Sequence, residues 1–387
     1  MTALLEVRDL EVQIPLPGGV LHAVRKVSLT ASAGQAVGLV GESGSGKSLT
    51  LRAIMDLLPS PARITGGTIV VAGVDVTGLS PARRREHLSG TLAMIFQDSL
   101  TALNPTMRVG DQVAEVPARR LGMSKAAARA RALDLLTQVG IRDPEKRYRA
   151  YPHEMSGGMR QRICIAIALS AEPALILADE PTTALDVTIQ AQVLGVLADL
   201  RQTRGVGLVL VTHDLAVVSG TCEQLNVMYG GRIVESGRTE QLLAEPHHPY
   251  TAALLRSVPD PALPVHRLLN IGGQPPDLLE VQPGCSFAPR CPAVLEQCRT
   301  SLPPLEPVTM ELVKSEPLMT DALTMQPRTT DALPQELRPG LPPGSGRASA
   351  CWRAGHPQDW PDVLTADLAD PADPAALTDL TAGQVRA

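Results

Sequence analysis

Aromatic residues are scarce in this chain. Phe, Tyr and Trp together make up 2 % of its 387 residues, and none of them precedes Phe96. A core built on aromatic side chains is therefore excluded, and Leu, Val, Ile, Ala and Met must fill the interior. The N-terminal quarter of the chain also offers no aromatic ring on which a ligand could stack.

Long apolar runs are missing as well. A membrane-spanning helix needs ~18–20 apolar residues, whereas the longest candidate, Ile163–Ala171, is about half that length and ends at Glu172. The N-terminus reaches Glu6, Arg8 and Asp9 too early for a secretory signal peptide. We therefore expect a cytosolic chain whose membrane association, if any, comes through a partner.

The chain has no excess of positive charge. Its 35 Lys and Arg stand against 40 Asp and Glu, a formal net charge of −5, which gives no support for a nucleic-acid-binding surface. Charged residues at 19 % and hydrophobic residues at 44 % are the balance of a globular protein. We expect no nucleic-acid partner.

A glycine-rich motif, GESGSGKS, occupies Gly41–Ser48. An apolar strand, Ala36–Val40, precedes it, and Leu49–Leu57 follows with helical spacing, which is the context that a phosphate-binding loop requires. Glycines let successive N–H groups converge on one anion. Lys47 can reach the β- and γ-phosphates, and the Ser48 hydroxyl can ligate Mg²⁺. The residues predicted to bind ATP are Gly41, Glu42, Ser43, Gly44, Ser45, Gly46, Lys47, Ser48 and Leu49.

Two further strands end in polar side chains. Asp179 and Glu180 follow the apolar run Ala174–Ala178, and His213 follows Gly207–Thr212. Continuous apolar runs of this length predict buried parallel strands, and ligands bind at the carboxyl ends of such strands. A neutral imidazole at His213 can hydrogen-bond a γ-phosphate, which makes it a candidate for sensing hydrolysis.

A helical insert is predicted between the first and second halves of the sheet. Ser124–Val139 is rich in Ala, Leu and Arg at helical spacing, with Ser124 as the expected N-cap. Gln97 lies at the junction with this insert. Its amide can ligate Mg²⁺ while its backbone moves with the insert, which would couple the nucleotide state to domain movement.

The motif MSGGMRQR at Met155–Arg162 completes the set. Together with GESGSGKS, Gln97, LILADEPT and VTHD, it resembles the ATP-binding cassette (ABC) ATPases over roughly residues 4–256. The resemblance implies an α/β P-loop fold with a RecA-like parallel sheet, an antiparallel β subdomain, a helical subdomain and an irregular C-terminal extension. The expected ranges are 1–256 for the ATPase, with the helical subdomain at 98–170, then 257–302 for the extension, 303–350 for a disordered insert and 351–387 for a loosely ordered tail.

The resemblance also implies roles for individual residues. Asp179, with Ser48 and Gln97, would hold Mg²⁺, and Glu180 would polarise the attacking water, with His213 and Gln97 as further catalytic residues. Contacts to ATP held by a second ATPase subunit are implied for Ser156, Gly157, Gly158 and Asp186. Members of the family usually stack an aromatic residue on adenine about two dozen residues before the glycine loop. This chain has none there, so Ile14 and His22 are the candidates to cover the base.

Longer segments resemble the oligopeptide/dipeptide importer ATPases in particular. They are QDSLTALNP at 97–105, YPHEMSGGMRQR at 151–162, ADEPTTALDVTIQAQ at 178–192, HHPYTAALL at 247–255 and GCSFAPRCP at 284–292. This resemblance implies two membrane permeases, a second related ATPase, an extracytoplasmic binding protein and a location on the cytoplasmic face of the membrane. Nickel importers share these features. Two classes of protein outside transport also have a P-loop: cassette ATPases that do not act in transport, and simple P-loop kinases. A kinase would not need Ser156–Gly158.

Six cysteines fall into two groups. Cys164 and Cys222 lie singly in apolar stretches and are expected to be buried small hydrophobes. The other four cluster late in the chain, which in a reducing compartment favours metal over disulfides. Several dipeptide-type members carry a [4Fe–4S] cluster on such a set, so the resemblance implies this cluster; a zinc site and unligated thiols are also compatible with the pattern. The implied ligands are Cys285, Cys291, Cys298 and Cys351.

Overall fold

The computed structural model of the chain describes residues 3–98, 102–182, 187–257, 271–307 and 347–351. Its larger sheet has the strand order β11-β12-β10-β9-β3-β8-β7-β6, and a second sheet has the order β2-β1-β4-β5. The strands are β1 (Ala3–Leu16), β2 (Gly19–Ser32), β3 (Ala36–Val40), β4 (Arg63–Val71), β5 (Val74–Asp75), β6 (Leu92–Ile95), β7 (Leu175–Asp179), β8 (Gly207–Thr212), β9 (Gln224–Tyr229), β10 (Arg232–Arg238), β11 (Glu306–Pro307) and β12 (Ala348–Ser349).

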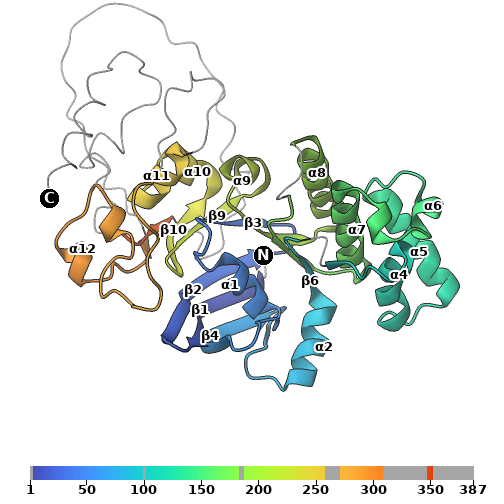
Figure 1. Cartoon of the computed structure of the whole chain (residues 1–387), viewed down its shortest axis with the longest axis horizontal. Coiled ribbons are helices and arrows are strands. Elements are labelled where there is room, and N and C mark those ends of the chain that lie inside the picture. The colour runs from blue at the N-terminus through green and yellow to red at the C-terminus, as the bar shows by residue number, and fades with distance from the viewer. Residues whose placement is uncertain (1–2, 99–101, 183–186, 258–270, 308–346, 352–387) are drawn as a thin grey trace, which may run out of the picture.

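The helices divide between the sheet and a separate helical subdomain. Those of the subdomain are α4 (Val109–Arg119), α5 (Lys125–Gln138), α6 (Pro144–Tyr148) and α7 (Gly157–Ser170), and they gather at one end of the molecule (Figure 1). The others are α1 (Lys47–Ile54), α2 (Pro81–Thr91), α8 (Val187–Arg204), α9 (Leu215–Thr221), α10 (Thr239–Ala244), α11 (Pro249–Arg256) and α12 (Gln297–Thr300), with short 3₁₀ turns η1 (Pro152–Glu154) and η2 (Ala288–Arg290). Among the described residues, no helix combines the length and apolar character needed to cross a membrane.

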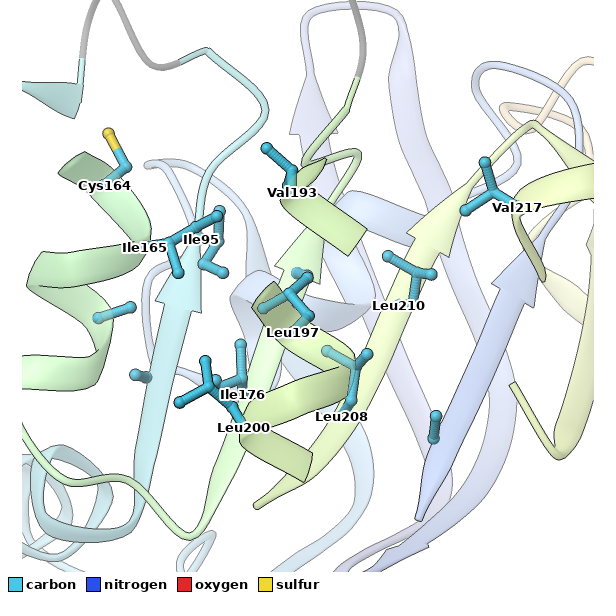
Figure 2. Packing of buried hydrophobic residues seen from close by; sticks show 14 of the residues in the cluster. Ile95, Cys164, Ile165, Ile176, Val193, Leu197, Leu200, Leu208, Leu210 and Val217 are labelled. Carbon is cyan, nitrogen blue, oxygen red and sulfur yellow. The ribbon is translucent and has the colours of Figure 1, made fainter. Parts of the chain in front are cut away.

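The five central strands, β9, β3, β8, β7 and β6, are parallel throughout. Alternate residues of one strand point to opposite faces, and both faces are covered. On β8, Leu208 and Leu210 pack toward α7, α8 and α9, while Val209 and Val211 pack toward the second sheet. Figure 2 shows the packing on the helix-covered face, with Leu197 of α8 beside Leu208 and Leu210 of β8. Continuous apolar strands follow from this two-sided burial.

The second sheet is antiparallel and carries the hairpin of β1 and β2, with β4 on the other side of β1. The fold expected from the sequence, a parallel core with an antiparallel and a helical subdomain, is thereby confirmed. The predicted strands at Ala36–Val40 and Gly207–Thr212 have the same bounds in the structure. The predicted N-cap is also present, since Ser124 Oγ accepts a hydrogen bond from the Ala127 N–H at 3.3 Å.

The C-terminal extension differs from expectation at two points. Glu306–Pro307 and Ala348–Ser349, at the two ends of the range expected to be disordered, form β11 and β12. β12 pairs with both β10 and β11, because the free edge of β10 offers backbone donors and acceptors that composition does not reveal. Residues 308–346 of that insert lie outside the described residues.

A buried polar cluster fixes the start of α11. Glu235 is fully buried and accepts hydrogen bonds from the N–H groups of His247 at 2.7 Å and His248 at 3.0 Å. His248 caps the helix, since its Nδ1 accepts from the Tyr250 N–H at 3.1 Å. Its side chain is 1 % exposed, and burial lowers its pKa to about 3. The imidazole is therefore neutral in the folded protein.

We expect His248 to make the folded protein sensitive to acid. Because its pKa is lower in the folded than in the unfolded state, its contribution to stability is present above about pH 6.5 and is lost as the pH falls toward 3. Between pH 7 and pH 5 the loss should be about 2 kcal/mol in the free energy of unfolding. Urea unfolding at a series of pH values measures this, with His248→Asn as the variant, because Asn can accept the same helix-capping bond but does not titrate.

The quantity that tests this prediction is the difference between wild type and His248→Asn in the pH dependence of the free energy of unfolding. Burial raises the pKa of Glu235 to about 7, so this carboxyl stabilises the fold as the pH falls and opposes His248 in both proteins. Wild type should lose more stability than His248→Asn on going from pH 7 to pH 5. Parallel pH profiles would show that His248 does not titrate on unfolding.

Candidate nucleotide-binding site

The loop at Gly41–Gly46 connects β3 to α1 and lies at the carboxyl end of the central strands. Gly41 and Gly46 have φ angles of +155° and +103°. A Cβ atom at Gly41 would lie 2.0 Å from the Met228 carbonyl oxygen, and one at Gly46 would lie 2.4 Å from that of Ala23. Both positions therefore need glycine for conformation and for space, which explains why the loop has this sequence.

Lys47 is the cation of the loop. Its side chain curls back so that Nζ donates to the carbonyl oxygens of Gly41 and Glu42, each at 2.8 Å, and the residue is only 5 % exposed. Burial lowers the pKa of Lys47, and the nearby carboxylates of Glu180 and Asp179 oppose that shift. The ammonium group is thus held at the centre of the loop, facing two carboxylates.

Ser48 and Asp179 meet although they are 131 positions apart in the sequence. The Ser48 hydroxyl donates to Asp179 Oδ1 at 2.8 Å, and Asp179 is 1 % exposed. Burial raises the pKa of Asp179, while the hydrogen bond from Ser48 opposes this shift. A buried carboxylate beside a hydroxyl provides oxygen ligands of the kind that Mg²⁺ prefers.

Glu180 lies at the meeting point of three segments. Its Oε2 accepts from Gln97 Nε2 at 2.8 Å, and its Oε1 is 3.4 Å from His213 Nδ1. Its backbone has a φ angle of +46°, which is uncommon for a residue with a side chain, and its N–H bonds the Val211 carbonyl of the neighbouring strand at 2.9 Å. The structure therefore brings together the three side chains that the sequence marks as catalytic.

These residues fit a magnesium–nucleotide ligand in their chemistry. Mg²⁺ prefers oxygen donors and keeps several waters and phosphate oxygens, so one or two protein ligands suffice. Ser48, Asp179 and the amide oxygen of Gln97 would hold the ion, and the buried charge of Asp179 is the kind that a cation neutralises. The loop glycines and Lys47 suit the phosphates.

Three of the residues implied to act across a dimer, Ser156, Gly157 and Gly158, lie at the start of α7. Ser156 caps α7, and its Oγ accepts from the Met159 N–H at 3.4 Å. Ser156 and Gly157 are exposed, and a Cβ at Gly158 would lie 2.6 Å from Cγ2 of Ile189 on α8. Close packing of the two helices thus explains the second glycine. Asp186, the fourth residue of this set, lies outside the described residues.

The two candidates to cover the base lie on the β1–β2 hairpin. Ile14 pairs with Leu21, and His22 pairs with Gln13, whose Nε2 lies 3.4 Å from His22 Nδ1. Both Ile14 and His22 are half-buried. Neither offers the stacking area of a large aromatic ring.

The expected iron–sulfur ligands do not form a metal site. Within the described part of the chain, which includes Cys285, Cys291, Cys298 and Cys351, no three or more His, Cys, Asp or Glu side chains are placed to hold a metal ion. Cys285 N–H bonds the Cys298 carbonyl at 2.8 Å, Cys298 Sγ accepts from the Leu295 N–H at 3.4 Å, and Cys291 packs against Ala252 and Ala293. The cluster prediction is therefore not supported, because backbone pairing and packing set these positions. Cys164 and Cys222 are buried, as expected.

Two residues, Tyr250 and Arg290, contact the loop although the sequence assigned them no role there. The Tyr250 hydroxyl accepts from the Glu42 N–H at 2.8 Å, and Arg290 forms a salt bridge with the Glu42 carboxylate at 2.8 Å. Arg290 also donates to the Tyr229 hydroxyl at 3.1 Å. The segments HHPYTAALL and GCSFAPRCP were visible as motifs, but nothing in their spacing indicates a contact with a loop over 200 positions away.

Comparisons with known proteins agree with this geometry. Residues 24–183 match the family described as ABC transporter, and residues 234–298 match the C-terminal region of oligopeptide/dipeptide transporters. The chain is 47 % identical over 299 residues to the dipeptide transport ATP-binding protein DppD of Bacillus subtilis, covering 77 % of this chain and 89 % of that protein. It is 45 % identical over 303 residues to the oligopeptide transport ATP-binding protein OppD of Salmonella typhimurium, covering 78 % and 90 %.

A solved structure shares the fold. The ATP-binding cassette MJ0796, as a dimer in a post-hydrolysis state with ADP and phosphate, superposes with a TM-score of 0.55 at 26 % identity, covering 61 % of this chain and 98 % of that one. The identities and coverage of the curated relatives are high enough to assign the family. The chain therefore belongs to the ABC transporter ATP-binding proteins of the oligopeptide/dipeptide type.

Proposed function

We propose that this chain hydrolyses MgATP as the energy-coupling subunit of an importer for di- and oligopeptides. The observation that carries the proposal is the convergence of Gln97, Glu180 and His213 beside the phosphate-binding loop, with Ser48 bonded to Asp179. These side chains come from four separate segments and serve no common packing purpose. Phosphoryl transfer needs positioning and charge neutralisation, and this arrangement provides both.

Each residue has a part in the proposed reaction. The loop N–H groups and Lys47 bind the phosphates, and Glu180 accepts a hydrogen bond from the attacking water and draws off its proton. Ser48, Asp179 and Gln97 would hold Mg²⁺, which would supply neutralisation of the phosphate charge when bound. His213 is 61 % exposed, so its imidazole can turn between Glu180 and a γ-phosphate, which allows it to register phosphate release.

The competent unit in this proposal is a dimer of ATPase subunits with ATP between them. The exposed Ser156 and Gly157 at the N-terminus of α7 support this, because a helix N-terminus with free N–H groups attracts an anion. Gly158 packs against α8, and this close contact would fix the position of the Ser156–Gly158 segment relative to α8. Asp186 is assigned to the same interface on resemblance alone. A second, related ATPase is the proposed partner.

The helical subdomain would transmit the movement that follows ATP binding and hydrolysis to two membrane permeases. These permeases would hold this chain at the cytoplasmic face of the membrane, and they would link it to a solute-binding protein. A hollow of about 800 Å³ lies over α6 and η1, and it is the proposed seat for a cytoplasmic permease helix. Acidic and basic side chains both line this hollow, and the stacked rings of Tyr151 and His153 form part of its wall. Gln97, bonded to Glu180, connects the nucleotide site to the start of this subdomain.

Peptide is favoured over nickel as the transported substrate. The match of residues 234–298 to the oligopeptide/dipeptide C-terminal region supports this choice, as do the names of the relatives. No iron–sulfur cluster enters the proposal, because the described thiols do not form a metal-binding group.

Co-purification tests the proposed function. The chain would be tagged, native membranes solubilised in mild detergent, and bound proteins identified by mass spectrometry. We expect two permeases, a second ATPase and a solute-binding protein, whose bound ligand names the substrate. Recovery from the soluble fraction with nucleic acid or ribosomal proteins would overturn the transport function but leave the ATPase chemistry intact.

A further inference from the structure

The C-terminal extension reaches into the phosphate-binding loop. Arg290, in the turn η2, donates from Nη1 to Glu42 Oε2 at 2.8 Å and from Nη2 to Glu42 Oε1 at 3.1 Å. This two-point pairing joins residues 248 positions apart and links the second residue of the loop to the extension. Paired bonds between guanidinium and carboxylate fix orientation as well as distance.

Arg290 itself is held rigidly. Its remaining donors bond the carbonyl oxygens of Gly272 at 2.8 Å and Ile271 at 2.9 Å, and the Tyr229 hydroxyl at 3.1 Å. The side chain is 5 % exposed, against 24 % for Glu42. A guanidinium group with all of these partners cannot shift without breaking several bonds, so it is a fixed point for the loop.

Glu42 is held from three directions. Its side chain bonds Arg290, its N–H bonds the Tyr250 hydroxyl at 2.8 Å, and its carbonyl oxygen accepts from Lys47 Nζ at 2.8 Å. The last contact matters most, because Lys47 is the cation of the loop. The position of Glu42 therefore helps to determine where the ammonium group lies.

The extension is anchored to the rest of the domain independently of Arg290. The His22 N–H bonds the Leu278 carbonyl at 2.9 Å, and Arg25 Nη1 donates to Ser286 Oγ at 3.3 Å. A cavity of about 290 Å³ separates the loop at Glu42–Ser45 from Pro275–Leu278 of the extension. Arg290 joins the extension to the loop through Glu42, which is one of the residues that line this cavity.

We propose that the C-terminal extension braces the phosphate-binding loop, with Arg290 as a positioning residue that holds Glu42, and through it Lys47, in the geometry that binds ATP. The inference rests on the proposed function, since it assumes that ATP binds at this loop. In this proposal Arg290 acts through Glu42, so its loss should weaken ATP binding and leave the chemical step almost unchanged. Removing one partner of a buried ion pair leaves the other charge uncompensated, which would let the loop relax.

The brace should also act in the opposite direction. Coupling between two sites is reciprocal in binding free energy, so bound MgATP should hold the extension more firmly against the loop. Backbone amides of residues 271–301 would then exchange with solvent more slowly when MgATP is present. This response is a property of the coupling, and a merely structural salt bridge would not produce it.

The test uses Arg290→Met in the full chain, within the assembled transporter for kinetics and as the purified subunit for MgATP titration calorimetry. We expect the KM and the Kd for ATP to rise about tenfold, within the usual range of coupling between sites, while kcat changes less than about twofold. Arg290→Lys should be intermediate, because an ammonium group cannot form the paired bonds. Arg299→Met, an exposed arginine of the same extension, is the matched control and should behave as wild type.

A double-mutant cycle keeps the test decisive if Arg290→Met folds poorly. Glu42→Gln retains size but loses the charge, and it should raise the KM in wild type about as much as Arg290→Met does. It should raise the KM less in Arg290→Lys, which keeps only part of the pairing, and have no further effect in Arg290→Met. Hydrogen exchange should slow at residues 271–301 on adding MgATP to wild type but not to Glu42→Gln. Additive effects of the two substitutions, or an unchanged KM in Arg290→Met, would overturn the brace. Failure of wild type itself to bind MgATP would instead overturn the proposed function.

Discussion

Replacing Glu180 by glutamine should slow ATP hydrolysis by roughly 10²–10⁴-fold, the usual contribution of a general base, while MgATP binding stays largely intact. The amide has the same shape, so it can still meet Gln97 and His213, which lie 2.8 Å and 3.4 Å from the carboxylate oxygens. It cannot draw a proton from water. Steady-state phosphate release in the assembled transporter and MgATP titration of the subunit measure the two properties separately.

The same substitution should accumulate the ATP-bound dimer. Hydrolysis is the step that reopens the proposed interface, so blocking it traps the closed state, which size-exclusion chromatography with MgATP would detect. Glu86→Gln, an exposed carboxylate on α2, is the matched control and should leave both turnover and dimer lifetime unchanged. A Glu180→Gln protein that hydrolyses at the wild-type rate would remove Glu180 from the mechanism.

Replacing Lys47 by alanine should weaken MgATP binding by roughly 100-fold or more and leave no measurable turnover. Charge-assisted hydrogen bonds contribute about 1.5–3 kcal/mol each, and this ammonium group is the one cation that the loop sequence itself supplies. Its removal also leaves the Gly41 and Glu42 carbonyl oxygens without the donor that curls the loop around them. Both the ligand contact and the shape of the loop are lost together.

Titration of the purified subunit with MgATP and phosphate release from the assembled transporter measure this effect. Lys125→Ala, an exposed lysine at the start of α5, is the control for loss of one positive charge and should bind as wild type. Normal turnover in the Lys47→Ala complex would refute the phosphate-loop assignment. Together with Glu180→Gln, which should bind MgATP but hydrolyse it far more slowly, this variant separates binding from chemistry.

Local features of the molecule were predictable from residue order. The strands Ala36–Val40 and Gly207–Thr212 appear with the expected bounds, because each depends on neighbours in the chain. The helix after the glycine-rich motif begins at Lys47, two residues earlier than predicted, and ends at Ile54. Runs of apolar residues need burial on both faces, and glycines permit the positive φ angles of the loop. The role predicted for Lys47 rests on its charge beside the glycines, whereas the role predicted for Glu180 rests on the family resemblance.

Contacts between distant segments were not predictable in this way. The thiols of Cys285, Cys291 and Cys298 are close in sequence, yet their spacing does not bring them together as a metal site, because backbone pairing with Cys298 and packing of Cys291 decide their positions. Strands β11 and β12 form because the edge of β10 is free to pair. No periodic pattern in the sequence predicts the positions of these cysteines or the pairing of these strands.

The sequence by itself determined the chemistry available to this protein: a phosphate-binding loop, a pair of carboxylates after a strand, and a helix N-terminus at Ser156. Only the tertiary structure decided which of these side chains meet, such as Glu180 with Gln97 and His213, and Arg290 with Glu42. The physical reason is that side-chain chemistry and local conformation depend on adjacent residues. A contact across 248 positions depends instead on how a segment without regular secondary structure packs against the folded core.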